Sequence, residues 1–415
     1  MKNPKLLALL LLSAIKLSAV PCQGQFNFYK FSTQIDSTFN KDISADNAEF
    51  AGTFCSFIGQ YQKALYYFEQ AQFANRKVPT KDQLSDWNRQ SNAILSSYKP
   101  TSAKEFILQE AKKTRIVIIN EAHHIPLHRI FAESLLADLK KQGYNFIGFE
   151  DLALSSILLQ NKYPVIGMGY YSTEPCFSNM IRTSLKLGFT PFGYEAKAQG
   201  GKEREIGQAE NIKKLIDKNP QAKFIIYCGY SHALEDSTHN GDSIHEDWGL
   251  AMAGRLKRMT GIDPLTIDQV ELTETGTPYF DNYLRQSINL PYPAVFINKN
   301  GIAFGKANSK KQYDVNVYHP DTKYINGRPG WLYYDDKVAV SIVDKINIAF
   351  PTLVFAYDEG EDTGKAIPVD VIELRDKYDS KKLILYNNTR YEILIKNIAG
   401  EKQLVKALYE QLHKE

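Results

Sequence analysis

An apolar run of strand length that ends in an acidic residue or a histidine occurs four times in this chain, and this repeat constrains the fold most. The runs are residues 116–119 before Glu121, His123 and His124, 144–149 before Glu150, 189–194 before Glu195, and 223–229 before His232. Between them, residues 127–141 and 203–218 place apolar side chains at three- and four-residue spacing, as amphipathic helices do. Strands and helices that alternate about every 30 residues are typical of βαβ units. The sequence therefore predicts an α/β fold with a mostly parallel central sheet flanked by helices.

The polar residues that follow the four runs are expected to form one site. In a parallel sheet the carboxyl ends of the strands meet along one edge, and ligands bind at that edge. The predicted catalytic residues are Glu121, His123, His124, Glu150 and His232, together with Arg204 from the helical segment 203–218. Glu195 and His245 are predicted to bind substrate, His245 because it belongs to a charge-rich segment shortly after the fourth run.

The order of these motifs resembles that of the erythromycin-esterase-like, ChaN-like and Tiki superfamily. The resemblance is carried by Asn-Glu-Ala-His-His at 120–124, Phe-Glu at 149–150, Arg-Glu at 204–205 and Gly-Tyr-Ser-His at 229–232, and it covers about residues 112–272. It implies an α/β catalytic domain over residues 111–272 in which acids and histidines activate water. The sequence departs from the family pattern at Asn120, where the family usually has glycine.

The resemblance leaves two interpretations of the adjacent histidines. Erythromycin esterases carry a Glu-x-x-His motif, which His124 would complete. ChaN-like sequences carry Glu-x-His followed by x-x-Pro-x-His, which Glu121, His123, Pro126 and His128 fit as well. The helical segment that starts at Arg204 is more similar to the esterases, and this favours His124 slightly.

One chemistry that fits these residues needs no cofactor. A neutral histidine takes a proton from water, and Glu121 and Glu150 hold the imidazole and the water. Arg204 or His232 then stabilises the oxyanion that forms on the substrate. This scheme predicts an exported hydrolase that cleaves an ester- or amide-type bond in a small-molecule or peptide substrate.

Three alternatives remain open. The resemblance to Tiki metalloproteases implies a protease in which a divalent metal (Zn, Mn or Fe) activates water, with Glu121, His124, Glu150 and His232 as predicted ligands. The resemblance to ChaN implies a haem- or iron-binding protein without catalysis, with His128 or His123 as axial ligand. A serine hydrolase is disfavoured, because the segment around Ser231 nearly matches a Gly-x-Ser-x-Gly nucleophile elbow but no helical pattern follows it.

The start of the chain predicts a signal peptide. Lys2 and Lys5 precede an apolar stretch at residues 6–14 and small residues up to Gly24, which predicts cleavage near there and a signal peptide over residues 1–24. The mature protein is then expected to be periplasmic or extracellular. No later stretch of about 18 apolar residues occurs, so the mature chain is expected to lack a transmembrane segment.

The flanking regions differ in character from the predicted catalytic domain. Residues 25–110 predict a helical extension with one hairpin similar to a tetratricopeptide repeat, around residues 59–71. One such unit cannot bury its own apolar face, so the hairpin is expected to pack on the catalytic domain. Residues 273–415 predict a β-rich region with many turn residues. Leucines at 404, 408 and 412 predict a final helix over residues 401–414.

Composition excludes few classes of protein. The 50 basic and 47 acidic residues leave a formal charge of only +3, and no basic stripe indicates nucleic acid as a partner. Cys55, Cys176 and Cys228 are odd in number after the predicted cleavage, so they cannot form a full disulfide framework. They are expected to be buried as small apolar residues.

Overall fold

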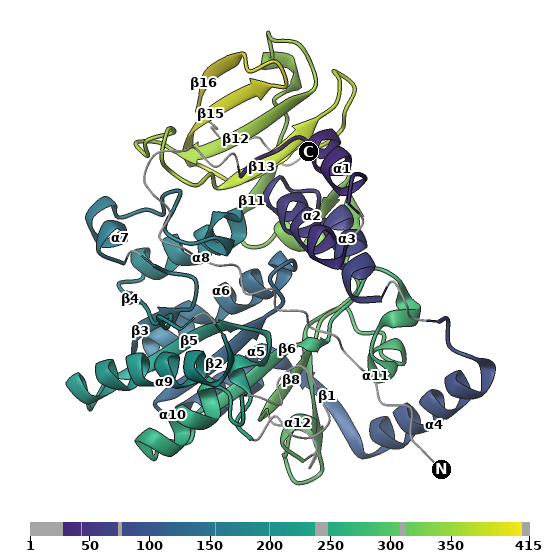
Figure 1. The fold of residues 1–415 in the computed structure, drawn as a ribbon, viewed down its shortest axis with the longest axis vertical. Coiled ribbons are helices and arrows are strands. Elements are labelled where there is room, and N and C mark those ends of the chain that lie inside the picture. The colour runs from purple at the N-terminus through teal and green to yellow at the C-terminus, as the bar shows by residue number, and fades with distance from the viewer. Residues whose placement is uncertain are drawn as a thin grey trace.

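A sheet of eight strands lies at the centre of the molecule (Figure 1). The computed structural model describes residues 28–42, 44–73, 77–153, 155–198, 200–236, 248–307 and 313–408. The sheet has the order β1-β7-β8-β6-β2-β5-β3-β4. Its strands are β1 (Tyr98–Ser102), β2 (Ile116–Glu121), β3 (Tyr144–Phe149), β4 (Thr190–Gly193), β5 (Lys223–Gly229), β6 (Leu265–Leu272), β7 (Ala294–Asn298) and β8 (Val315–Tyr318). Neighbours from β8 to β4 are parallel, whereas β7 is antiparallel to both β8 and β1. The predicted α/β class with a mostly parallel sheet is confirmed.

The sheet extends beyond the range 111–272 predicted for the catalytic domain. β1 lies in the segment predicted as helical, and β7 and β8 lie in the predicted C-terminal region. β1 is an edge strand whose side chains are exposed or half-buried, so it shows no apolar run. Its strand conformation comes from antiparallel pairing with β7, and an edge tolerates Pro100. The predicted boundaries at 110 and 272 are therefore wrong.

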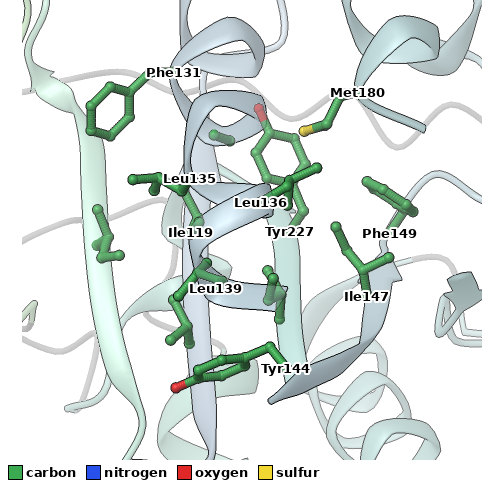
Figure 2. Packing of buried hydrophobic residues seen from close by; sticks show 14 of the residues in the cluster. Ile119, Phe131, Leu135, Leu136, Leu139, Tyr144, Ile147, Phe149, Met180 and Tyr227 are labelled. Atoms are coloured by element: carbon green, nitrogen blue, oxygen red, sulfur yellow. The ribbon is translucent and has the colours of Figure 1, made fainter. Parts of the chain in front are cut away.

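Helices cover both faces of the sheet. One face carries α9 (Gly201–Lys218) and α10 (Met252–Thr260), and the other carries α5 (Ala103–Glu110), α6 (Pro126–Lys141) and α8 (Pro175–Lys186). Ile116 and Ile118 of β2 pack toward α9 and α10, whereas Ile119 packs toward α6. Figure 2 shows Leu135 and Leu139 of α6 in the same apolar cluster as Ile119. This alternation follows from the two-residue period of a strand.

The first three helices of the described chain are α1 (Ser32–Phe39), α2 (Ala45–Phe57) and α3 (Tyr61–Phe73). α2 and α3 form the predicted hairpin and approach closely at Gly52, where an added Cβ would lie 3.0 Å from the carbonyl oxygen of Ala64. Phe57 packs in a core that includes Phe355 of the C-terminal region. Phe68 packs instead with residues that follow β2. The hairpin therefore contacts both parts of the molecule.

The C-terminal region is rich in strands, as predicted. It contains β9 (Tyr324–Ile325), β10 (Arg328–Pro329), β11 (Lys337–Val340), β12 (Thr352–Asp358), β13 (Asp370–Leu374), β14 (Leu383–Tyr386), β15 (Arg390–Asn397) and β16 (Lys402–Leu408). An antiparallel sheet has the order β13-β12-β15-β16, and β11 pairs with β14. Figure 1 shows this sheet beside α1, α2 and α3.

The predicted final helix is wrong where the structure describes it. Residues 402–408 form β16, which pairs along β15, and residues 409–415 lie outside the described ranges. Val405 packs against the apolar core of this sheet, whereas Leu404, assigned to the buried helix face, is 51% exposed. Pairing with the edge of β15 outweighs the leucine spacing, because strand formation depends strongly on tertiary context.

The remaining helices are α4 (Lys81–Ser97), α7 (Ser155–Asn161), α11 (Tyr283–Gln286) and α12 (Phe304–Ala307). Within the described ranges, none of the helices is long and apolar enough to cross a membrane. The predicted signal peptide over residues 1–24 lies outside those ranges and stays a prediction.

Candidate active site

The carboxyl ends of β2, β5 and β3 lie side by side, because β5 pairs with both of the other strands. Glu121 is opposite Gly229 in the register of β2 and β5, and Phe149 is opposite Tyr227. The first turns of α9 lie above the same edge and contribute Arg204. The structure thereby brings together Glu121, His123, Glu150, Glu195, Arg204 and His232.

Glu121 and His123 form a buried pair after β2. Nδ1 of His123 lies 2.9 Å from Glu121 Oε1. Glu121 also accepts hydrogen bonds from the hydroxyl of Tyr227 at 2.7 Å and from Arg129 at 2.6 and 2.8 Å. Burial alone would raise the pKa of Glu121, but the Arg129 guanidinium and His123 outweigh it and lower that pKa to about 2. The ionised Glu121 therefore selects the tautomer of His123 with its proton on Nδ1.

Arg129 and Glu174 belong to this site, and the sequence analysis missed both. Arg129 is fully buried on α6 and donates to Glu174 Oε2 at 3.0 Å and to the carbonyl oxygen of His123 at 2.7 Å. Glu174 also caps α8 by accepting from the N–H of Phe177 at 2.9 Å, and it accepts from the Tyr61 hydroxyl at 3.3 Å. An arginine in the buried first turns of a helix was the signal that could have identified this network.

The second ring nitrogen of His123 lies beside Gly229. A Cβ added to Gly229 would lie 2.6 Å from Nε2 of His123 and 3.5 Å from Oε2 of Glu150. The imidazole stacks on Tyr171 with ring centroids 3.7 Å apart, and Tyr230 meets it edge-on at 5.0 Å. The missing side chain at Gly229 therefore leaves the room that the imidazole of His123 occupies, and Gly229 contacts both His123 and Glu150.

His124 packs against helix α3. Its ring stacks on Phe68 of α3 with centroids 3.5 Å apart, and its Nδ1 is 3.4 Å from the hydroxyl of Tyr230. Burial lowers the pKa of His124 well below the usual range, so this side chain is neutral. In the structure His123 is the histidine beside Glu121, and the slight preference for His124 as the functional residue stays a prediction.

A second polar cluster surrounds Arg204. Its Nη2 donates to Glu150 Oε1, and to Glu195 Oε2 at 2.6 Å, while Nε donates to Glu195 Oε1 at 3.1 Å. The N–H of Gly229 donates to Glu150 Oε2 at 2.6 Å. Burial would raise the pKa of Glu150, but His232 and Arg204 outweigh it and hold that pKa well below the usual range. Glu195 thus positions Arg204, and Glu150 is an ionised group between Arg204 and His232.

His232 lies between two carboxylates. Its Nδ1 is 2.8 Å from Glu205 Oε1 and its Nε2 is 3.3 Å from Glu150 Oε1. Burial alone would lower the pKa of His232, but Glu150 and Glu205 outweigh it and raise that pKa to about 10. Arg204 opposes this, because its Nη1 can only donate and lies 2.8 Å from His232 Nε2. With two carboxylates against one guanidinium, the cationic form of His232 is favoured.

Asn120, where the resembling family usually has glycine, holds the backbone of the site. Its side chain donates to the carbonyl oxygen of Tyr230 at 2.9 Å and to Asp268 Oδ1 at 2.8 Å, and accepts from the N–H of Gln269 at 2.7 Å. Tyr230 has a φ of +39°, which is uncommon for a residue other than glycine. These hydrogen bonds connect β6 to the turn that carries His232.

The donor set does not fit the metal-dependent alternative. Among the residues that the structure describes, no three His, Cys, Asp or Glu side chains are grouped so that they could hold a metal ion. His124, one of the predicted ligands, stacks on Phe68. The guanidinium of Arg204 contacts the carboxylates of both Glu150 and Glu195. A cation of the protein itself therefore neutralises these acids.

Other predicted residues take different places. His128 is fully buried, and its Nδ1 accepts from the N–H of Ala122 at 3.0 Å, so it supports the turn after β2. Ser231 lies in a short 3-10 turn, and residues 234–236 after it are not helical. His245 lies outside the described ranges, and its assignment to substrate binding stays a prediction.

Comparisons with known proteins give remote structural similarities only. No family model matches the chain, and no curated protein matches it. The type III effector HopBA1 is 11% identical, with 54% of this chain and 97% of that chain covered and a TM-score of 0.33. RRSP, a MARTX toxin effector domain from Vibrio vulnificus CMCP6, is 16% identical, with 50% of this chain and 44% of that chain covered and a TM-score of 0.28. Similarities of this size do not define a family.

Proposed function

We propose that this chain is a hydrolase in which His123 activates water to cleave an ester- or amide-type bond without a bound metal. The orientation of His123 carries the proposal. Its Nδ1 is bonded to Glu121 at 2.9 Å, and its Nε2 lies against Gly229, whose N–H donates to Glu150. An imidazole with a fixed tautomer and a lone pair on Nε2 is suited to act as a general base.

His123 moves one proton in two steps. Nε2 removes it from water as the water oxygen attacks the carbonyl carbon of the substrate, and ionised Glu121 stabilises the imidazolium that results. The same nitrogen then donates the proton to the leaving oxygen or nitrogen when the tetrahedral intermediate collapses. The products are an acid and an alcohol or amine, and His123 returns to its neutral form.

Arg204 and His232 would stabilise the negative charge that develops on the carbonyl oxygen. Arg204 Nη1 carries two hydrogens, and the neighbouring cationic His232 cannot accept either of them. Removing one such preorganised donor typically costs about 2.7–4 kcal/mol in transition-state stabilisation. Glu150 contacts both cations and is itself fixed by the N–H of Gly229, so it holds them in place.

Paired substitutions of the two histidines test the proposal. A panel of chromogenic esters and anilides is expected to reveal turnover that is unchanged by EDTA. His123→Phe keeps a ring against Tyr171 but removes both nitrogens, and should lower kcat by roughly 10²–10⁴-fold. His124→Phe is the matched control, because it keeps a ring against Phe68, and it should retain most of the activity.

Two results would contradict the proposal. Turnover that survives His123→Phe and is lost in His124→Phe would assign the base to the other histidine. Turnover that EDTA abolishes and Zn or Mn restores would require the metal-dependent mechanism. Loss of activity counts only if circular dichroism and thermal unfolding show that the variant is folded.

A further inference from the structure

We propose that His128 is a positioning residue, which holds the backbone between Glu121 and His123 in place from the first turn of α6. The inference rests on the hydrolase proposed above, in which His123 is the base and Glu121 orients it. Two sets of contacts carry it. One is a hydrogen bond from the peptide group that joins Glu121 to Ala122, and the other is a pair of hydrogen bonds that Gln269 donates to neighbouring carbonyl oxygens.

The peptide group between Glu121 and Ala122 is fixed by His128. The N–H of Ala122 donates to Nδ1 of His128 at 3.0 Å, and both residues are buried. A peptide group is planar, so a hydrogen bond to its N–H also limits the rotation of the backbone next to it. That backbone carries the Glu121 side chain on one side and leads to His123 on the other. His128 therefore acts on both members of the pair through the main chain.

The imidazole of His128 makes no other hydrogen bond within the part of the chain that the structure describes. Burial, and then the neighbouring His319, hold the pKa of His128 well below its usual range, so the ring is neutral. Since Nδ1 accepts a hydrogen bond, the proton is on Nε2, which is buried and unpaired among the described residues. An unpaired buried donor is costly, and an apolar side chain would avoid that cost. It would, however, leave the N–H of Ala122 without this acceptor, so the histidine serves that contact.

Gln269 of β6 holds residues on either side of this contact. Its Nε2 donates to the carbonyl oxygen of Asn120 at 2.8 Å and to that of His128 at 3.3 Å. Both carbonyl oxygens can only accept, so the amide nitrogen of Gln269 faces them, and its Oε1 accepts from His319 Nε2 at 3.2 Å. Asn120 directly precedes Glu121. One side chain therefore connects the end of β2 to the helix that carries His128.

Arg129, the next residue of α6, holds other parts of the same turn. It donates to the Glu121 carboxylate at 2.6 and 2.8 Å and to the carbonyl oxygen of His123 at 2.7 Å. None of these bonds involves the N–H of Ala122, which donates to His128. Removing the His128 contact should therefore change the alignment of the catalytic pair and leave the pair assembled.

Two substitutions of the same residue test whether the acceptor matters. His128→Leu removes the acceptor but keeps a buried side chain, and it should lower kcat about tenfold or more with little change in KM, because a small misplacement of the base has a large effect on rate. His128→Asn is the matched control, since its Oδ1 takes the place of Nδ1, and it should keep most of the wild-type kcat. Wild-type kcat in His128→Leu would overturn the inference. An equal loss in both variants would also overturn it, because packing rather than the acceptor would then be responsible.

Nuclear magnetic resonance tests the inference without turnover. In the wild-type protein, a scalar coupling between the amide nitrogen of Ala122 and Nδ1 of His128 would report their hydrogen bond directly. Its absence would overturn the inference even if His128→Leu does not fold. The ring nitrogen shifts of His123 report its tautomer, which should carry the proton on Nδ1 in the wild type and in His128→Asn, and should be mixed in His128→Leu.

These measurements separate the positioning role of His128 from the proposed hydrolysis. A change of the His123 tautomer in His128→Leu, without turnover of any ester or anilide by the wild type, would refute the hydrolase and leave the positioning role intact. Turnover in which His128→Leu changes neither kcat nor the His123 tautomer would refute the positioning role and leave the hydrolase intact.

Discussion

Gly229 decides how closely His123 can approach Glu150. Its backbone dihedrals, φ −81° and ψ 144°, suit any residue, so alanine would fit the strand without backbone strain. The added Cβ, however, would lie 2.6 Å from His123 Nε2, and the imidazole would have to move. We expect Gly229→Ala to lower kcat at least tenfold, because small misplacements of a general base have large effects on rate. Steady-state kinetics on the best ester of the panel would measure this.

Gly200→Ala is the control for that substitution. Gly200 lies just before α9, close to Arg204 in sequence, in extended conformation, and no described heavy atom lies within 4 Å of a Cβ added there. It should leave kcat and the unfolding midpoint unchanged. Equal activity of both alanine variants would show that His123 does not act from its observed position.

The residues of the candidate site were largely predictable, but their pairing was not. A carboxylate or histidine at each strand end identified Glu121, Glu150 and His232, because a parallel sheet collects those ends at one edge. The choice between His123 and His124 depended on which ring the α2–α3 hairpin covers. That contact, Phe68 on His124, joins residues far apart in sequence and leaves no local pattern.

Contacts between segments far apart in sequence also limited the prediction of helices and strands. β2, β3, β4 and β5 were predictable because their apolar runs are buried between helices on both faces. β1 and β16 could not be predicted in this way. β1 forms by pairing with β7, which is distant in sequence, and β16 forms by pairing with the edge of β15. A pattern read along one segment reports the burial of that segment, and it does not report which edge is available for pairing.

Helix α6 is joined to β2 and α8 by one side chain. Arg129 forms hydrogen bonds with Glu121, with Glu174 and with the carbonyl oxygen of His123, all in the interior. Arg129→Met keeps the length of the side chain but leaves two carboxylates without their cation. Breaking a buried ion pair on one side typically costs about 3–5 kcal/mol, and we expect a loss of that order in the free energy of unfolding. Denaturant titration would measure it.

The double variant Arg129→Met with Glu174→Gln provides the control for the charge. Removing the second charge should recover part of the lost stability if the unpaired carboxylates cause the loss. If the free energy of unfolding of the double variant falls by the sum of the losses measured for Arg129→Met and Glu174→Gln alone, packing rather than charge is responsible.

At the scale of the whole molecule, the two ends of the described chain share one core. Phe31, Phe57 and Tyr67 pack with Leu353 and Phe355 in a single apolar cluster. The start of α1 is also bound by β13, where Glu373 accepts hydrogen bonds from Ser32 at 2.9 Å. The α2–α3 hairpin therefore contacts the C-terminal sheet on one side and His124 on the other. Unfolding of the C-terminal sheet should for this reason also affect the candidate site.

The charge of His232 gives the whole molecule a predicted dependence on pH. Its pKa is raised to about 10 in the folded protein by Glu150 and Glu205, against the opposing effect of burial, and returns to about 6.5 on unfolding. A raised folded pKa contributes stability that is fully present below pH 6.5 and is lost as the pH rises toward 10. The difference in unfolding free energy between wild type and His232→Gln should therefore shrink across this window, by at most about 1.4 kcal/mol per pH unit.

His319→Gln is the control for this pH dependence. Burial lowers the pKa of His319 to about 3, so the residue is neutral in both states well above pH 6.5 and its contribution should stay flat between pH 7.5 and 10. Denaturant titrations of wild type and both variants at pH 6, 7, 8, 9 and 10 would separate the two cases. A flat difference for His232→Gln as well would mean that His232 is neutral and accepts the hydrogen bond from Arg204 Nη1 at 2.8 Å. Arg204 would then be the remaining cation available to the oxyanion, and Arg204→Lys should impair turnover more than His232→Gln.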